Sequence, residues 1–147
     1  SWIGNMPFED GILDDRVSRR GIMRRYKSLV SAVDRGNTKL DVLDIFNLAQ
    51  SDDSIARQTF EETGYILGEA LKVFVKEFRP GCIVIGGGVS GAFDYLLPGL
   101  EKAIVVENAN APQPEIIKAT EIDSCTLIGV AIYSRLLNRR YCRRKSL

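Results

Sequence analysis

The sequence predicts an α/β domain that is rich in helix and holds a short buried sheet. Apolar residues recur at helical spacing over residues 56–78, and Pro80 ends that pattern. The run Cys-Ile-Val-Ile, which begins at Cys82, is apolar throughout and has no polar alternation. Such a run is typical of a strand that is buried on both faces, as in sheets covered by helices. A glycine-rich turn follows it directly, which is the order of elements in an α/β protein.

Length and composition favour a single soluble domain. Of the 147 residues 45% are hydrophobic, and 20 basic residues nearly balance 19 acidic ones, which gives a formal charge of +1. A charge this close to zero gives no general reason to expect a polyanionic partner. No apolar run approaches the ~20 residues of a membrane span, and residues 1–10 lack the pattern of a signal peptide. We therefore expect one domain over residues 1–147, in the cytoplasm and without a membrane partner.

Cysteine and histidine usage argues against disulfides and zinc. The three cysteines are Cys82, Cys125 and Cys142, and the chain contains no histidine. An odd number of widely spaced cysteines predicts neither a disulfide framework nor a zinc site of the usual ligand spacing. A reducing compartment fits this pattern. Because the chain begins with Ser1 and not with methionine, we expect it to be a fragment of a longer protein.

Two helices are predicted before the longest one. Between Val17 and Val33 the apolar residues follow a helical stripe, and the opposite side is basic. We interpret that basic side as a solvated helix face, with phosphate binding as the less favoured alternative. Residues 41–50 predict a short second helix. Ser51 or Asp52 is then expected to cap the next helix.

The third predicted helix is the longest element of the chain. At ~1.5 Å per residue it would be about 40 Å long. Gly64 and Gly68 lie one turn apart in its middle, where glycine lowers helix propensity, and they therefore predict the close approach of another backbone. Its apolar stripe consists of Ala56, Phe60, Thr63, Leu67, Leu71, Phe74 and Phe78.

The segment after the glycine turn predicts two helices and a strand. Ser90 is placed to cap a short helix, which Pro98 should interrupt or restart. Residues 115–120, Glu-Ile-Ile-Lys-Ala-Thr, predict a second strand, and residues 124–140 predict a closing helix. The basic residues at the end of the chain favour the dipole of that helix, and we interpret them as a solvated cap.

The glycine turn has two interpretations. Gly86, Gly88 and Gly91 have the spacing G-x-G-x-x-G directly after a strand, and Glu107 lies near the place of an acidic residue that binds a ribose hydroxyl. That pattern would indicate a dinucleotide (NAD or FAD) module with a strand over residues 103–107. Against it, a proline interrupts the helix that should face the pyrophosphate, and the turn comes late in the chain. The dinucleotide interpretation is therefore the weaker one.

Four segments resemble the ROK family of sugar kinases and sugar-responsive repressors. Residues 78–104, which contain Gly-Gly-Gly-Val-Ser, resemble the family's helix end, strand and adenosine motif. Residues 64–78 resemble its long helix with paired glycines, and residues 13–22 resemble its Leu-Glu-x-x-x-Ser helix start. Residues 124–136 resemble its last helix. The four matches occur in the family's order and spacing, so the chain is identified as a member.

The resemblance implies half of an actin-like ATPase fold. In this family two lobes of RNase-H-like topology close on ATP and a sugar, and residues 1–147 would form most of the C-terminal lobe. At the adenosine motif, glycine lets the nucleotide approach the backbone closely. The alternative is a strand-to-helix turn that needs glycine only for its dihedral angles. The implied nucleotide-binding residues are Gly86, Gly87, Gly88, Val89 and Ser90.

The sugar site departs from the family pattern. The first eight residues align with Gly-Glu-x-Gly-His-Met, whose glutamate and histidine bind the sugar and whose histidine also binds zinc in many members. Here Trp2 and Asn5 occupy those two positions, and the cysteine-rich zinc loop is absent from the sequence. Asp14 aligns with a second sugar-binding glutamate, although it is also a suitable acid for a first helical turn. The resemblance therefore implies Asn5 and Asp14 as sugar-binding residues, and no zinc.

The resemblance implies ATP with magnesium as cofactor and a sugar as ligand. Phosphoryl transfer needs phosphate-holding loops and a carboxylate base. The family's versions of these groups do not occur in residues 1–147, so we assign no catalytic residue and expect no sugar phosphorylation by this chain alone. The N-terminal lobe would be missing, or supplied by another chain.

The kinase relationship has a regulatory alternative. The same lobe would serve as the effector-binding part of a ROK repressor, which would bind DNA only if the parent protein carries an N-terminal winged helix. A homodimer is also expected, because ROK proteins commonly dimerise through this lobe. The sequence leaves open which sugar is bound and whether the parent protein is a kinase or a regulator.

Overall fold

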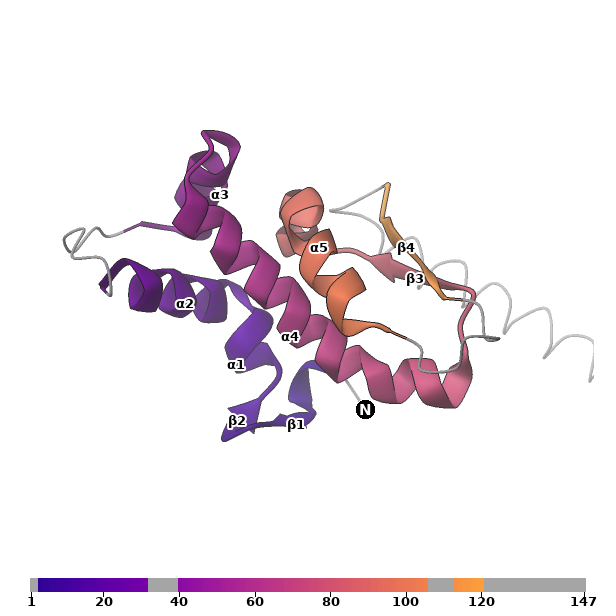
Figure 1. The fold of residues 1–147 in the computed structure, drawn as a ribbon. Coiled ribbons are helices and arrows are strands. Elements are labelled where there is room, and N and C mark those ends of the chain that lie inside the picture. The colour runs from indigo at the N-terminus through magenta and orange to yellow at the C-terminus, as the bar shows by residue number, and fades with distance from the viewer. Residues whose placement is uncertain (1–2, 32–39, 106–112, 121–147) are drawn as a thin grey trace, which may run out of the picture.

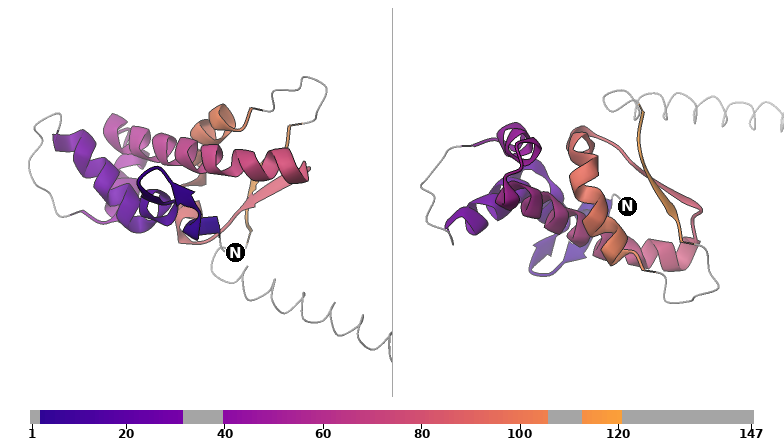
Figure 2. Two further views of the ribbon diagram at one scale, coloured as in Figure 1. Left: turned by 90° about the horizontal axis from the view of Figure 1, so that it is seen from below. Right: turned by 45° about the horizontal axis from the view of Figure 1, so that its top comes forward.

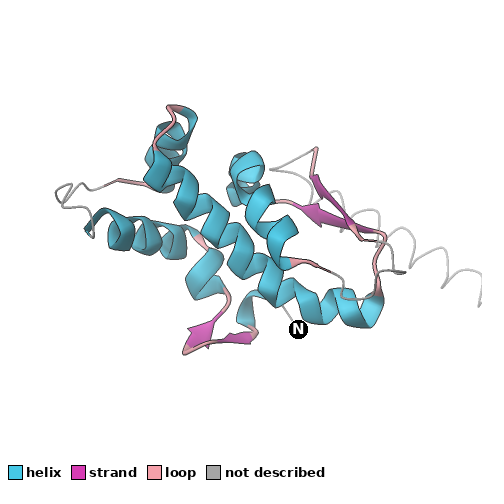
Figure 3. Cartoon of the chain, viewed as in Figure 1, coloured by secondary structure: helices cyan, strands magenta, loops and turns pink. Residues whose placement is uncertain are grey.

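The computed structural model describes residues 3–31, 40–105 and 113–120, which fold into helices and two small sheets (Figures 1 and 3). Trp2, Glu107 and the predicted closing helix over residues 124–140 lie outside these ranges. No helix of the described part is long and apolar enough to cross a membrane. In chain order the elements are η1 (Ile3–Asn5), β1 (Pro7–Phe8), β2 (Gly11–Ile12), α1 (Asp14–Val17), α2 (Arg19–Ser31), α3 (Val42–Gln50), α4 (Ser54–Phe78), β3 (Cys82–Ile85), η2 (Gly88–Ala92), α5 (Phe93–Ala103) and β4 (Glu115–Lys118).

The long helix α4 is the axis of the fold, as the repeat of apolar residues predicts. The helices α1, α2 and α3 contact its first half, and α5 packs along it from the other side (Figure 1). The predicted caps Ser51 and Asp52 are wrong, because the side chain of Asp53 accepts a hydrogen bond from the backbone N–H of Ala56. Asp53 has the extended backbone that directs a capping carboxylate over the first turn.

The core forms where α4 meets α2, α3 and α5. Phe60 of α4 is fully buried, and its ring packs with the rings of Phe46 from α3 and Tyr95 from α5. Thr59 and Thr63 are buried in the same stripe, and their hydroxyls donate to backbone carbonyls one turn earlier, so both remain hydrogen-bonded. The core residues with almost no exposed surface also include Leu13, Ile22, Ile45, Ala49, Ala56, Leu96 and Leu100.

The glycines of α4 and α5 let the two helix backbones touch. A Cβ atom built on Gly64 would lie 2.0 Å from the carbonyl oxygen of Leu96, and one on Gly99 would lie 1.9 Å from the carbonyl oxygen of Glu61. A Cβ on Gly68 would lie 2.5 Å from the Cβ of Ala103. The close approach predicted from Gly64 and Gly68 is therefore confirmed.

The helix predicted between Val17 and Val33 corresponds to α2, which begins at Arg19, and the predicted end at residue 33 lies outside the described ranges. Ser18 separates α1 from α2 with an extended backbone at ψ 172°, and its carbonyl accepts the first hydrogen bond of α2 from the N–H of Ile22. The predicted apolar stripe is confirmed on α2, where Ile22, Tyr26 and Val30 are buried.

The strands β3 and β4 form a parallel pair, with Ile83 opposite Ile116 and Ile85 opposite Lys118. Ile83, Ile85 and Ile116 pack toward the core, whereas Val84 on the opposite face is 59% exposed. The prediction that this strand is buried on both faces is wrong for the described residues, because only one of its faces packs on the core. In both views of Figure 2 the pair lies at the end of the domain away from α2 and α3.

Helix α5 differs from the predicted interrupted helix. Pro98 lies inside α5, which continues to Ala103. A proline inside a helix leaves the carbonyl four residues earlier without its partner. Here that carbonyl belongs to Asp94, an exposed residue of the first turn, where water can take the place of the missing N–H. Residues 104 and 105 follow the helix without forming a strand. This argues against the dinucleotide interpretation, which requires a strand over residues 103–107.

Candidate functional site

The glycine turn connects the carboxyl end of β3 to η2 and α5. Gly87 has φ 86° and ψ 176°, a backbone conformation that favours glycine. Gly88 and Gly91 have no such conformation, and a Cβ atom on either would meet no atom of the described residues within 4 Å. Thus the dihedral angles explain only one of these three glycines. The absence of side chains at Gly88 and Gly91 leaves open space beside the turn, which is what a ligand that contacts the backbone needs.

Ser90 stabilises this turn from inside. Its side chain is fully buried, and its hydroxyl donates to the carbonyl oxygen of Gly87 at 2.7 Å. The backbone N–H of Ser90 donates to the same carbonyl at 3.0 Å. The prediction that Ser90 caps the following helix is wrong, because Ala92 occupies the cap position of α5 and makes no side-chain cap bond. Val89 packs partly buried against the core, so the exposed part of the turn is Gly86 and Gly88.

The turn lies at the carboxyl end of the parallel strand pair. The backbone N–H of Ala119, just after β4, donates to the carbonyl oxygen of Ile85 at 2.9 Å, so the chain after β4 runs beside Gly86. Ligands of open α/β sheets bind outside the carboxyl ends of the strands, where the loops leave a crevice. Both the position of Gly86–Gly88 and its glycine content therefore suit a ligand site.

The two candidate sugar-binding residues lie at the open end of the hairpin formed by β1 and β2. Asn5 ends η1 and is exposed, and Asp14 begins α1 and is half-buried. Between them β1 and β2 form an antiparallel hairpin, and the N–H of Leu13 extends its ladder by donating to the carbonyl oxygen of Met6 at 3.0 Å. Asn5 and Asp14 directly flank this bond. The hairpin thus joins the residue that follows Asn5 to the residue that precedes Asp14.

Ion pairs secure the hairpin against α1. The guanidinium of Arg16 contacts the carboxylates of Glu9, at 2.8 Å, and Asp10, which form the hairpin turn. The backbone N–H of Ile12 donates to the carboxylate of Asp15 at 3.3 Å. Within residues 3–31, 40–105 and 113–120, no group of three cysteine, aspartate or glutamate side chains is placed to hold a metal ion.

The long helix α4 separates the two candidate sites. In Figure 1 the hairpin of β1 and β2 lies below α4, and the glycine turn between β3 and α5 lies above it. Both α1, which carries Asp14, and α5, which follows the turn, pack on α4. The spacing between the sites is therefore set by one continuous helix.

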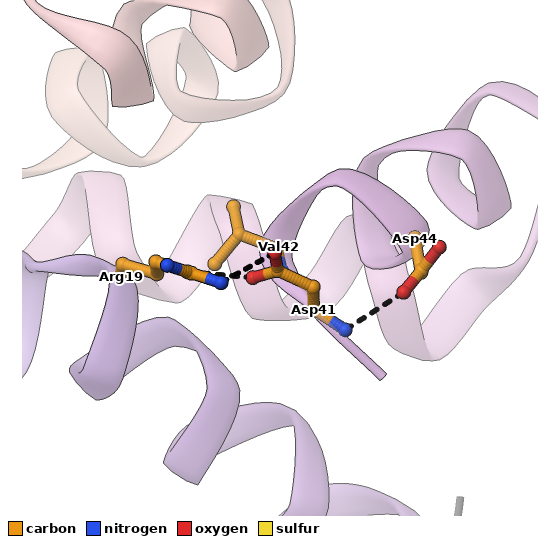
Figure 4. A network of polar contacts seen from close by, with 4 residues as sticks. All are labelled: Arg19, Asp41, Val42 and Asp44. Atoms are coloured by element: carbon orange, nitrogen blue, oxygen red, sulfur yellow. Dashed lines mark hydrogen bonds and ion pairs between the residues drawn. The ribbon is translucent and has the colours of Figure 1, made fainter. Parts of the chain in front are cut away.

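A polar network at the start of α3 was not predicted from the sequence (Figure 4). The guanidinium of Arg19 donates two hydrogen bonds, of 2.7 and 2.5 Å, to the carboxylate of Asp41, and the carboxylate of Asp44 accepts from the N–H of Asp41 at 2.8 Å. The bond from Arg19 and the N–H of Val42 lower the pKa of the Asp41 carboxyl. Arg19 and Asp41 thus remain a charged pair at neutral pH and join α2 to α3. Asp-x-x-Asp before an apolar run is the signal that could have indicated this cap.

Comparison with known proteins places the chain in a family. A sequence model described as "ROK family" matches residues 9–135. The DNA-binding transcriptional dual regulator NagC of Escherichia coli K12 is 27% identical over 123 residues, which are 81% of this chain and 30% of that protein. A glucokinase of Halalkalibacterium halodurans is 30% identical over 87 residues, which are 59% of this chain and 26% of that protein.

The fold also matches solved structures. A ROK family glucokinase from Streptomyces griseus, in complex with glucose and AMPPNP, superposes with a TM-score of 0.78 at 20% identity, over 91% of this chain and 51% of that chain. This match confirms the predicted fold class, half of an actin-like ATPase fold. The chain spans less than a third of each of these two relatives and about half of the glucokinase structure. Because the family match extends over most of its residues, the chain belongs to the ROK family.

Proposed function

We propose that residues 1–147 form the C-terminal lobe of a ROK protein related to ATP-dependent sugar kinases, with an adenine nucleotide bound at the turn Gly86–Gly88. The observation that carries this proposal is the open space at Gly88 and Gly91, two glycines that neither backbone dihedrals nor packing within the described residues explain. The Streptomyces griseus glucokinase, which shares the fold, was solved with the ATP analogue AMPPNP. The chemistry and the likeness therefore favour the same ligand class.

The residues present fit the adenosine part of ATP. Exposed glycine backbone at Gly86 and Gly88 allows close contact with a flat base and a ribose, and the bond from the Ser90 hydroxyl to Gly87 preorganises the turn. Magnesium would be bound mainly by the phosphates and by groups other than the described residues, because these hold no three-ligand cluster. ATP with magnesium is therefore the proposed cofactor, bound here through its nucleoside.

The sugar is proposed to bind at Asn5 and Asp14. An asparagine amide both donates and accepts hydrogen bonds, and an aspartate carboxylate accepts from two hydroxyls, so the pair suits a polyol. Their placement on either side of the bond between Met6 and Leu13 supports a joint role. We assign no catalytic residue, and we expect the chain alone to bind ligands without transferring a phosphoryl group.

A second candidate function is the effector-binding lobe of a sugar-responsive repressor. The NagC match, which covers 81% of this chain, favours it. So does Asn5, which stands where the resembling kinases have histidine, because a sensor needs ground-state binding and no transition-state geometry. A repressor lobe of this kind would bind the sugar and show no response to ATP. In either case a homodimer is part of the proposal.

A thermal-shift titration separates these possibilities. Ligands that bind only the folded state stabilise it by mass action, and at about 100 times Kd the gain is about 2.7 kcal/mol. For a domain of this size we expect ATP with magnesium to raise Tm by roughly 5–10 °C, and NAD and FAD to leave it unchanged. A shift with NAD or FAD alone would restore the dinucleotide interpretation. A shift with sugars only would favour the repressor lobe.

A further inference from the structure

Lys118 is the last residue of β4 and lies beside the glycine turn. In the parallel register it is the partner of Ile85, the residue that directly precedes Gly86. Neighbouring strands are about 4.8 Å apart, so the backbone of Lys118 is one strand spacing from the start of the turn. The bond from the N–H of Ala119 to the carbonyl of Ile85 fixes this register at the end of the strand.

The side chain of Lys118 stands on the face of the sheet that carries the helices. Side chains alternate along a strand, so Lys118 shares its face with Ile116, which packs toward the core. Helix α5 packs against β4, and it begins near the carboxyl end of β3. Lys118 is exposed although it belongs to the core-facing row. Lys118 therefore lies where the helices no longer cover the sheet, beside the start of the glycine turn.

No described side chain neutralises Lys118. Among the described residues it makes no ion pair, a property that it shares with other exposed cations such as Lys102, so its ammonium is not held by a described carboxylate. Lysine is less frequent in strands than β-branched and aromatic residues. Packing against the core therefore does not explain why a lysine occupies this position. Its ammonium offers three donors on a flexible stem of four carbons.

We propose that Lys118 is a nucleoside-recognition residue of the site at Gly86–Gly88, where its ammonium donates hydrogen bonds to acceptor atoms of the base or ribose. This inference rests on the proposed nucleotide site and extends it to β4. The nucleoside is the part that meets Lys118, because the strand register places this residue beside the turn that receives adenosine. Lys118 thus helps to select a nucleoside with acceptors on its edge over an apolar ring of similar shape.

Calorimetric titrations of adenosine, ADP and ATP with magnesium test this role on the 147-residue chain. The variant Lys118→Met keeps the length of the side chain and removes the donors. The matched control is Lys102→Met, which removes the same charge from the exposed last turn of α5, at the end of that helix away from the glycine turn. We expect Lys118→Met to weaken all three ligands by a similar factor of about 10, and Lys102→Met to leave them unchanged.

Three results would overturn the inference. If Lys118→Met binds all three ligands as wild type does, Lys118 has no role in the site, although the nucleotide site itself stands. If the loss grows from adenosine to ATP and disappears at high salt, Lys118 acts as a distant charge on the phosphates. If wild type binds none of the ligands, the proposed function fails, and the role of Lys118 fails with it.

Discussion

Gly64→Ala should destabilise the domain by about 3 kcal/mol or more, as expected for overpacking against a backbone that cannot move aside. The new Cβ would lie 2.0 Å from the carbonyl oxygen of Leu96. This clash can be removed only if α5 moves away from α4, and Leu96 and Leu100 would then leave the core. The higher helix propensity of alanine offsets only about 1 kcal/mol of this cost. Urea denaturation measured by circular dichroism gives the free energy of unfolding.

Gly81→Ala is the matched control. A Cβ on Gly81 would meet nothing within 4 Å, and φ at Gly81 is not positive, so we expect a change within about 0.5 kcal/mol. Gly99→Ala, which meets the carbonyl oxygen of Glu61 at 1.9 Å, should repeat the loss seen for Gly64→Ala. Wild-type stability in both Gly64→Ala and Gly99→Ala would mean that α4 and α5 do not touch as the structure describes.

Gly88→Val should abolish nucleotide binding and leave the domain folded. The valine side chain would extend into the space beside the turn, where its Cβ meets no described atom within 4 Å, and it would occupy the proposed place of the ligand. We expect the affinity for ATP to fall at least 100-fold, measured by calorimetric titration, with a far-UV spectrum and a melting temperature close to those of wild type.

The control for this variant is Gly81→Val, at the other end of β3. It adds the same side chain in similarly open surroundings and should leave ATP affinity unchanged. A folded Gly88→Val protein with wild-type ATP affinity would remove the assignment of the turn to adenosine. Gly64 and Gly88 thus differ in their predicted effect: glycine makes room for the chain itself at Gly64 and for a ligand at Gly88.

The long helix was predictable from its sequence because periodicity is a local signal. The stripe from Ala56 to Phe78 specifies α4, and the paired glycines indicate that a second backbone meets it. Residues 115–120 were correctly predicted to contain a strand. These elements are determined by neighbours in sequence, so a single chain reveals them.

Helix boundaries and burial depend on the surroundings, and the predictions failed there. Asp53 caps α4 in place of Ser51 or Asp52 because of the backbone conformation between α3 and α4. Pro98 stays inside α5 because the carbonyl it leaves unpaired is exposed in the first turn. Val84 looks buried in sequence because it is apolar, but in the described structure its face carries no covering element.

The glycine motif indicated the candidate site in the sequence, and the fold shows which other residues lie near it. The sequence suggests Gly86–Gly88 and the pair Asn5 and Asp14, but it cannot show that a hairpin bond joins Met6 and Leu13, the neighbours of that pair. Nor could it indicate Lys118, because its place beside the turn comes from the parallel register of β4 with β3. Such neighbours, far apart in the chain, become visible only in three dimensions.

The most direct test of nucleotide binding at this turn is a ¹⁵N–¹H correlation spectrum of the chain, recorded with and without ATP and magnesium. Binding at the turn should shift the amide signals of Gly86, Gly87 and Gly88, because the nucleotide would lie against their backbone. The amides of Gly64 and Gly68, enclosed between α4 and α5, should stay in place. Shifts absent from Gly86–Gly88 at saturating ATP would contradict the nucleotide site.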